Sequence, residues 1–112
     1  MGNAAVKNDA LGYTETLDAV VVALCRDQKR RERAIEGGSC SKRVAMEYKY
    51  INNLVREGAA EIVGEHYADV YIGEIGSRIG WVYSKIPLSE SAYKLEKAEV
   101  KLNIARKLHL LS

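Results

Sequence analysis

The sequence predicts an all-α protein, a small helical bundle with a C-terminal helix-turn-helix-like unit. Apolar residues recur at intervals of three and four in successive segments, which is the periodicity of amphipathic helices. Glycines and serines separate these segments, as helix stop and start signals do. The last segment has the most complete start signal, because Pro87 discourages helix just before a capping serine. Helices are therefore favoured over strands throughout.

The chain has 112 residues, a length typical of one domain. We expect residues 1–13 to form a flexible tail and residues 14–112 a single helical domain. No apolar run approaches the ~20 residues that span a bilayer, and no export signal begins the chain. Cys25 and Cys40 lack the spacing of a redox or zinc pair. We therefore expect a cytoplasmic protein with reduced thiols and no membrane contact.

The first predicted helix begins after Thr14 or Thr16, either of which can cap it. It is expected to continue to Ile35, where Gly37 and Gly38 stop it. Its apolar stripe consists of Leu17, Val20, Val21, Leu24 and Cys25.

The second predicted helix begins after Ser39 or Ser41 and ends near Gly64. Gly58 weakens its interior by about 1 kcal/mol relative to alanine. Its apolar face consists of Val44, Tyr48, Ile51, Val55 and Ile62. The first two helices are expected to pair as an antiparallel hairpin over residues 14–64.

A third helix is predicted over residues 67–78, and with the last helix it makes a helix-turn-helix-like unit over residues 67–111. Gly76 either ends this third helix or lets two backbones approach closely. Residues 80–87 form a longer turn than a minimal helix-turn-helix uses. A small β-hairpin through this region is the alternative interpretation.

The final helix has the best start signal in the chain. Ser89 is the predicted cap, and Glu90 faces the positive end of the helix dipole. Leu88 and Tyr93 are spaced as a hydrophobic staple. One apolar stripe follows, made of Tyr93, Val100, Ile104, Leu108 and Leu111.

Leu95 and Leu102 lie on the opposite side of this final helix from its apolar stripe. Two exposed leucines seven residues apart predict a second contact surface. Its occupant is either another subunit, which would make a homodimer, or the N-terminal helices.

The chain carries no recognisable catalytic or metal-binding signature. His66 and His109 have no metal-ligand partner at a familiar spacing, and no nucleophile elbow or P-loop is present. Glu57, Glu61 and Glu65 share one helix face, which is typical of a solvated surface. We expect a protein that is not an enzyme and has no cofactor.

Charge alternates in blocks along the chain. Residues 26–56 contain nine basic and four acidic residues, a net charge of +5, although the whole chain carries only +2. A solvated helix face with internal ion pairs is one interpretation of this block. The other is contact with the DNA backbone, which adds salt-dependent affinity. The predicted backbone contacts are Lys29, Arg30, Arg33, Lys42, Arg43 and Lys85.

The final helix carries side chains suited to a DNA recognition helix at its start. Ser89, Ser91 and Lys94 stand in the first turns, where side chains meet base edges, and Lys97 and Lys101 follow. Lys97 is close to the apolar stripe, so snorkelling is its alternative role. Acidic residues that repel phosphates interrupt the set, and a purely structural helix is the alternative for the whole segment. These acidic residues are Glu90, Glu96 and Glu99.

Two segments resemble a known family. IPLSESAYKLEKAEVKLNIARKLHLL, preceded by YIGEIGSRIG, is similar to the C-terminal part of phage transcription regulators of the ArpU/RinA type. DQKRRERAIEGGSCSKRVAMEYKYINNLV resembles their N-terminal helical region. Those proteins look like small relatives of sigma-factor region 4, with a C-terminal helix-turn-helix. The resemblance covers most of residues 26–111.

The resemblance implies a non-enzymatic regulator that binds double-stranded DNA and acts on phage late genes or packaging functions. RNA polymerase is a further partner that it implies. By position, Ser89, Ser91, Tyr93, Lys94 and Lys97 would begin the recognition helix. The chain differs from the family's pattern at Leu95 and Glu96, where basic side chains are expected. A helical protein-interaction or dimerisation module without DNA binding is the alternative function.

Overall fold

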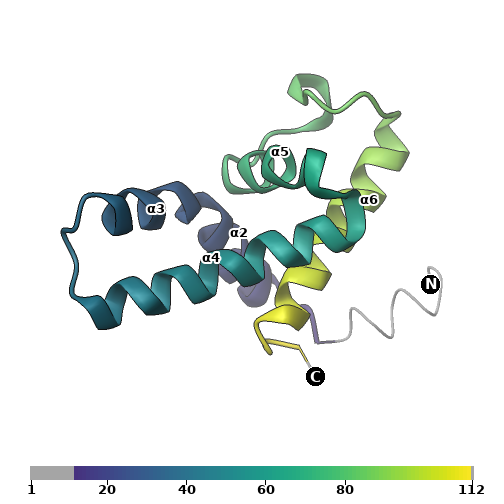
Figure 1. Ribbon diagram of the computed structural model, residues 1–112. Coiled ribbons are helices and arrows are strands. Elements are labelled where there is room, and N and C mark those ends of the chain that lie inside the picture. Colours follow the sequence, from purple (N-terminus) through teal and green to yellow (C-terminus); the bar gives the residue numbers. More distant parts are fainter. Residues whose placement is uncertain (1–11, 112) are drawn as a thin grey trace.

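The computed structural model describes residues 12–111 and is all-α over that range (Figure 1). The helices are α2 (Glu15–Arg26), α3 (Gln28–Glu36), α4 (Lys42–Val63), α5 (Glu65–Gly76), the short 3-10 helix η1 (Trp81–Tyr83) and α6 (Glu90–Lys107). No strand occurs among these residues, so the β-hairpin alternative is not adopted. Within the same range no helix is long and apolar enough to cross a membrane. Nearly all of the predicted tail, residues 1–11, lies outside the described residues.

The predicted first helix is two helices that meet at Asp27. Thr14, one of the two caps that the sequence offers, caps α2 by accepting a hydrogen bond from the Leu17 N–H. The backbone of Asp27 then leaves the helical conformation, and α3 takes a different direction (Figure 1). This change lets α2 pack on α5 and α6 while α3 packs on α4. A continuous helix would place its second half away from α4, so the prediction of one unbroken helix is wrong.

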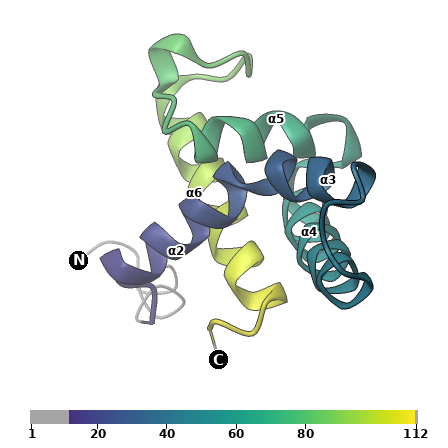
Figure 2. The same cartoon turned by 90° about the vertical axis from the view of Figure 1, so that its left-hand side faces the viewer.

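The longest helix, α4, contacts α3, α5 and α6 (Figures 1 and 2). Ser41 caps it by accepting from the Val44 N–H, and Gly64 ends it with a φ of +84°. Gly58 has a packing reason for its place in the middle of the helix. A Cβ there would lie 2.8 Å from the Ile104 Cα, so glycine permits the close crossing of α4 and α6.

α3 lies beside the first half of α4, so the predicted hairpin is formed by α3 and α4 alone (Figure 1). A buried polar cluster joins them. The Arg31 guanidinium donates to the Asn52 side-chain oxygen at 2.6 Å and to the Leu24 carbonyl at 2.6 Å. Gln28 and Asn52 exchange hydrogen bonds through their side-chain amides and main-chain carbonyls. Burial lowers the pKa of Arg31. This member of the basic run is therefore structural and does not lie on a solvated face.

The apolar core forms where α2, α4, α5 and α6 cross. The predicted stripe of α6 supplies three buried residues, and α5 supplies a stacked tyrosine. The rings of Tyr71 and Tyr93 are 6.0 Å apart. The largest fully buried side chains are Tyr71, Tyr93, Ile75, Ile104, Val21, Val55 and Val100.

The connection from α5 to α6 runs from Ser77 to Ser89 and contains η1. A helix-turn-helix uses a turn of about three to four residues, so this connection is much longer. Ser89 caps α6 by accepting from the Ala92 N–H, as predicted. The helix ends at Lys107, and His109 reverses the chain with a φ of +59°. Leu111, which the sequence places in the helical stripe, packs on the core from outside the helix.

Gly76 and Gly73 lie in the same helix but meet different surroundings. A Cβ on Gly76 would lie 2.6 Å from the Arg26 Cα and N, whereas one on Gly73 would meet nothing within 4 Å. Gly76→Ala should therefore destabilise the fold by about 1–3 kcal/mol through overpacking. Gly73→Ala, the matched control, should stabilise it by about 0.5–1 kcal/mol through helix propensity.

Urea unfolding followed by circular dichroism measures both changes. Equal effects of the two substitutions would show that α2 and α5 do not cross closely at Gly76.

Candidate nucleic-acid interface

Part of the predicted recognition helix is exposed. Ser89 and Ser91 both face solvent, although the Ser89 hydroxyl is engaged as the cap of α6. Lys94 is exposed and forms an ion pair with Glu90 at 2.8 Å. Such a surface pair contributes little to stability, so Lys94 can exchange it for a phosphate. These three residues remain available to a partner.

The other predicted recognition residues face inward. Tyr93 is only 1% exposed, which excludes direct DNA contact and corrects that assignment. The Lys97 ammonium donates to the Ile79 carbonyl at 2.7 Å and lies 5.2 Å from the centre of the Tyr93 ring. Burial lowers the pKa of Lys97. Lys101 pairs with Asp18 at 2.9 Å and ties α6 to α2. Lys97 and Lys101 are therefore structural cations here.

Glu74 organises the loop before α6. Its buried carboxylate accepts hydrogen bonds from the Ser84 hydroxyl at 2.6 Å, the Lys85 N–H at 2.8 Å and the Tyr93 hydroxyl at 2.8 Å. Burial alone would raise the pKa of Glu74, but these donors hold it below the ordinary value. Sequence reasoning missed this residue. Its one sequence signal is an acidic side chain among the apolar residues of α5.

Glu96 has a structural role as well. The Tyr71 hydroxyl donates to its carboxylate across α5 and α6. Burial, followed by this hydrogen bond, raises the pKa of Tyr71. The departure of Glu96 from the basic pattern expected of a recognition helix therefore has a packing explanation.

The predicted backbone contacts are all exposed. Lys29, Arg30 and Arg33 lie on α3, and Lys42 and Arg43 lie in the first turn of α4. Two of these residues form surface ion pairs, Arg30 with Asp27 at 3.5 Å and Arg43 with Glu47 at 3.4 Å. The first turns of α3 and α4 contain no acidic residue. Cations at a helix N-terminus oppose the dipole. Asp27, the N-cap of α3, already supplies an anion there, so a bound anion would relieve α4 alone.

Two adjoining hollows on the surface of α5 connect Lys85 with the basic residues of α3. Lys85 lines a hollow of about 330 Å³ between α5 and the following loop. Lys29 lines a second hollow of about 370 Å³ between α3 and α5. Asp69, Gly73 and Ser77 line both hollows, so the two adjoin over the outer face of α5.

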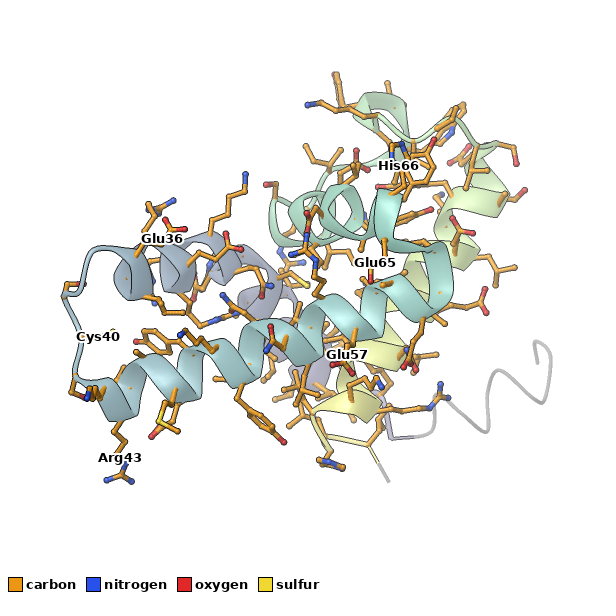
Figure 3. All side chains as sticks on the ribbon, viewed as in Figure 1. Glu36, Cys40, Arg43, Glu57, Glu65 and His66 are labelled. Atoms are coloured by element: carbon orange, nitrogen blue, oxygen red, sulfur yellow. The ribbon has the colours of Figure 1, made fainter. Side chains whose placement is uncertain are left out.

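The start of α6 is remote from the turn between α3 and α4. Figure 1 shows the two on opposite sides of the molecule. In Figure 3, Arg43 points away from the body at the far end of α4, near Cys40. The structure therefore separates the exposed recognition residues from Lys42 and Arg43, and one partner must be extended to contact both.

The acidic face predicted to be solvated is partly engaged. Lys107 of α6 pairs with Glu61 at 2.6 Å and with Glu57 at 3.4 Å. Glu65 and His66 lie apart from them at the start of α5 (Figure 3). Residues 12–111 contain no cluster of three or more histidine, cysteine or acidic side chains that suits a metal ion.

Comparisons with known proteins return no match. No protein-family model, no curated protein and no solved structure matches this chain. The candidate interface is therefore defined by its own charges and geometry.

Glu74→Gln removes the charge that three donors stabilise, and should destabilise the fold by about 1–3 kcal/mol at neutral pH. The folded-state pKa of Glu74 lies below the ordinary 4.5. Its contribution is thus fully present above that pH and is lost as the pH falls through the folded pKa. The difference in unfolding free energy between the two proteins should therefore shrink in acid.

Urea titrations at several pH values measure this difference. Glu99→Gln, at an exposed position of α6, is the control and should be neutral at each pH. A Glu74→Gln effect that is independent of pH would contradict the assigned role.

Proposed function

We propose that the protein is a DNA-binding regulator of transcription, without catalytic activity, that acts in the cytoplasm. The single observation that carries this proposal is the concentration of exposed cations on α3 and the first turn of α4. These residues are Lys29, Arg30, Arg33, Lys42 and Arg43. The +5 charge of residues 26–56 is otherwise poorly compensated within that block. A polyanion is the partner that such a surface favours.

The chemistry of these residues suits phosphate contact. Arginine forks match phosphate oxygens with two hydrogen bonds, and lysine adds a point charge. Each neutralised phosphate releases condensed counterions, so affinity falls steeply with salt. Such contacts hold the protein on the duplex without reading its sequence. In this proposal Lys85 adds a contact on the far side of α5.

Sequence reading is assigned to the start of α6. Ser89, Ser91 and Lys94 are the exposed side chains there that can reach base edges. The resemblance to ArpU/RinA-type regulators supports a phage or prophage context, with RNA polymerase as a further partner. Because only these three side chains are assigned to base edges, phosphate contacts supply most of the affinity in this proposal.

Lys29→Ala combined with Arg33→Ala should weaken binding to duplex DNA similarly for all sequences. Each lost phosphate contact should lower the slope of log affinity against log salt by about one unit. Lys94→Ala should instead change the preference between sequences. Fluorescence anisotropy of a labelled prophage promoter duplex, from about 50 mM salt upward, measures both effects.

Unfolding of each variant serves as the control, because exposed substitutions away from partners change stability little. Absence of duplex binding at about 50 mM salt would overturn the proposal, since phosphate contacts are strongest there.

A second candidate function is a dimerising interaction module. Leu95 is 56% exposed on α6, which is unusual for a leucine without a partner. Leu102 on the same helix is half-buried, so Leu95 would carry most of the contact. This surface predicts a homodimer through α6.

Leu95→Lys combined with Leu102→Lys should convert such a dimer into monomers, because it places charges in an apolar interface. Light scattering after size-exclusion chromatography measures the molar mass of the particle in solution. Leu95→Lys alone shows how much of the effect comes from the exposed leucine and how much from the half-buried Leu102. A monomeric parent protein, or a dimer that survives both changes, would exclude this function.

A further inference from the structure

The loop between α5 and α6 ends in an exposed apolar tip. The tip consists of η1, where Trp81 is 39% exposed, Val82 75% and Tyr83 80%. Figure 1 shows this loop projecting from the body. Three consecutive large apolar residues at such exposure are costly for a protein without a partner. The exposed tip therefore indicates a binding site.

The tip is held in place. The Trp81 indole N–H donates to the Leu88 carbonyl at 2.8 Å, which fixes the ring against the start of α6. Directly after the tip, the Ser84 hydroxyl and the Lys85 N–H both bind the buried Glu74 carboxylate. The backbone closes with a hydrogen bond from the Ser84 N–H to the Trp81 carbonyl at 3.1 Å. A ligand thus meets an indole ring and a backbone that are already ordered, which reduces the entropy cost of binding.

A hollow lies beside the tip, and its lining suits a flat aromatic ligand with an anionic backbone. Tyr83 and Ile79 supply apolar walls, Ser77 a hydroxyl and Lys85 a cation. Gly73 leaves the floor open, because no atom lies within 4 Å of where its Cβ would be.

The carboxylates near this hollow are paired or buried. Asp69 pairs with Arg56, and Glu74 accepts three hydrogen bonds. Glu74 keeps its charge but is only 7% exposed. Lys85 is exposed and forms no ion pair with the described residues, so the exposed unpaired charge of this lining is positive. The adjoining hollow continues over Gly73 to Lys29, with Arg26 and the half-buried Glu32 also in its lining.

We propose that the tip binds unpaired nucleotides. Bases stack on Trp81 and Tyr83, Lys85 contacts the phosphate beside them, and the strand crosses α5 over Gly73 toward Lys29. Exposed aromatic rings beside unpaired cations are the combination by which single strands are bound without regard to sequence. This inference rests on the proposed function, because it extends the same basic surface from paired to unpaired nucleic acid.

Trp81 is the only tryptophan of the chain, so its fluorescence reports directly on the tip. The protein is titrated with a blunt duplex, with the same duplex carrying an overhang of about ten thymidines, and with that overhang made abasic. The thymidine overhang should quench Trp81 and tighten binding about tenfold, as base stacking on an aromatic ring does. The abasic overhang keeps the phosphates and should do neither. A uridine overhang distinguishes RNA from DNA as the source of the bases.

Tyr83→Ala and Gly73→Leu should each remove the gain from the overhang, the first by deleting a ring and the second by filling the hollow. Both should leave affinity for the blunt duplex unchanged. Tyr50→Ala, at a tyrosine of α4 that is 59% exposed, is the matched control and should change neither reading.

Equal affinity for all three DNAs, or a gain that survives Tyr83→Ala, would overturn the proposal. If Trp81 fluorescence shifts with anionic vesicles and not with the overhang, the tip binds a membrane and the proposal is overturned. If it shifts when the protein concentration alone is raised, the tip binds a second copy, and the proposal is overturned likewise. Blunt-duplex binding is read separately by anisotropy, so failure of the proposed function is distinguished from failure of the tip.

Discussion

The buried carboxylate of Glu74 is the interaction on which the second half of the molecule depends. An isolated carboxylate in an apolar interior is unstable unless donors surround it. Here the donors come from the loop and from α6, so satisfying one charge also sets the path of the chain between the two helices. Tyr93 is the central link, because its ring packs in the core while its hydroxyl reaches Glu74. The exposed tip and the first turn of α6 take their positions from this network.

Two close backbone crossings set the arrangement of the longer helices. Gly58 admits α6 at Ile104, and Gly76 admits α2 at Arg26. The second crossing lies next to Asp27, where α2 gives way to α3. Helix approach, the turn of the chain and the placement of α3 on α4 are therefore coupled at one point. In both crossings a residue with poor helix propensity is retained because a side chain would not fit.

The structure sorts the basic residues of this chain into two classes. Arg31, Lys97 and Lys101 face inward and bind carbonyl, amide or carboxylate oxygens of neighbouring helices. Lys29 and Arg33 face solvent on α3. A net charge of +2 conceals this division. The outward class lies on α3 and at the start of α4, so the proposed interaction with DNA depends on that surface more than on the lysines of the last helix.

The all-α class, the cap at Ser89 and the apolar stripe of the last helix are local properties, and the sequence by itself determined them. For the first two caps the sequence narrowed the choice to two residues each, and the structure selects Thr14 and Ser41. Capping and periodicity act over a few residues, so they can be recognised along the chain. The break at Asp27, the inward turn of Arg31 and Lys97, and the partners of Glu74 were decided only by the tertiary structure. Each depends on residues far apart in sequence, such as Arg31 with Asn52. The residues next to a cation in the sequence do not determine whether its side chain binds a carbonyl oxygen or is solvated by water.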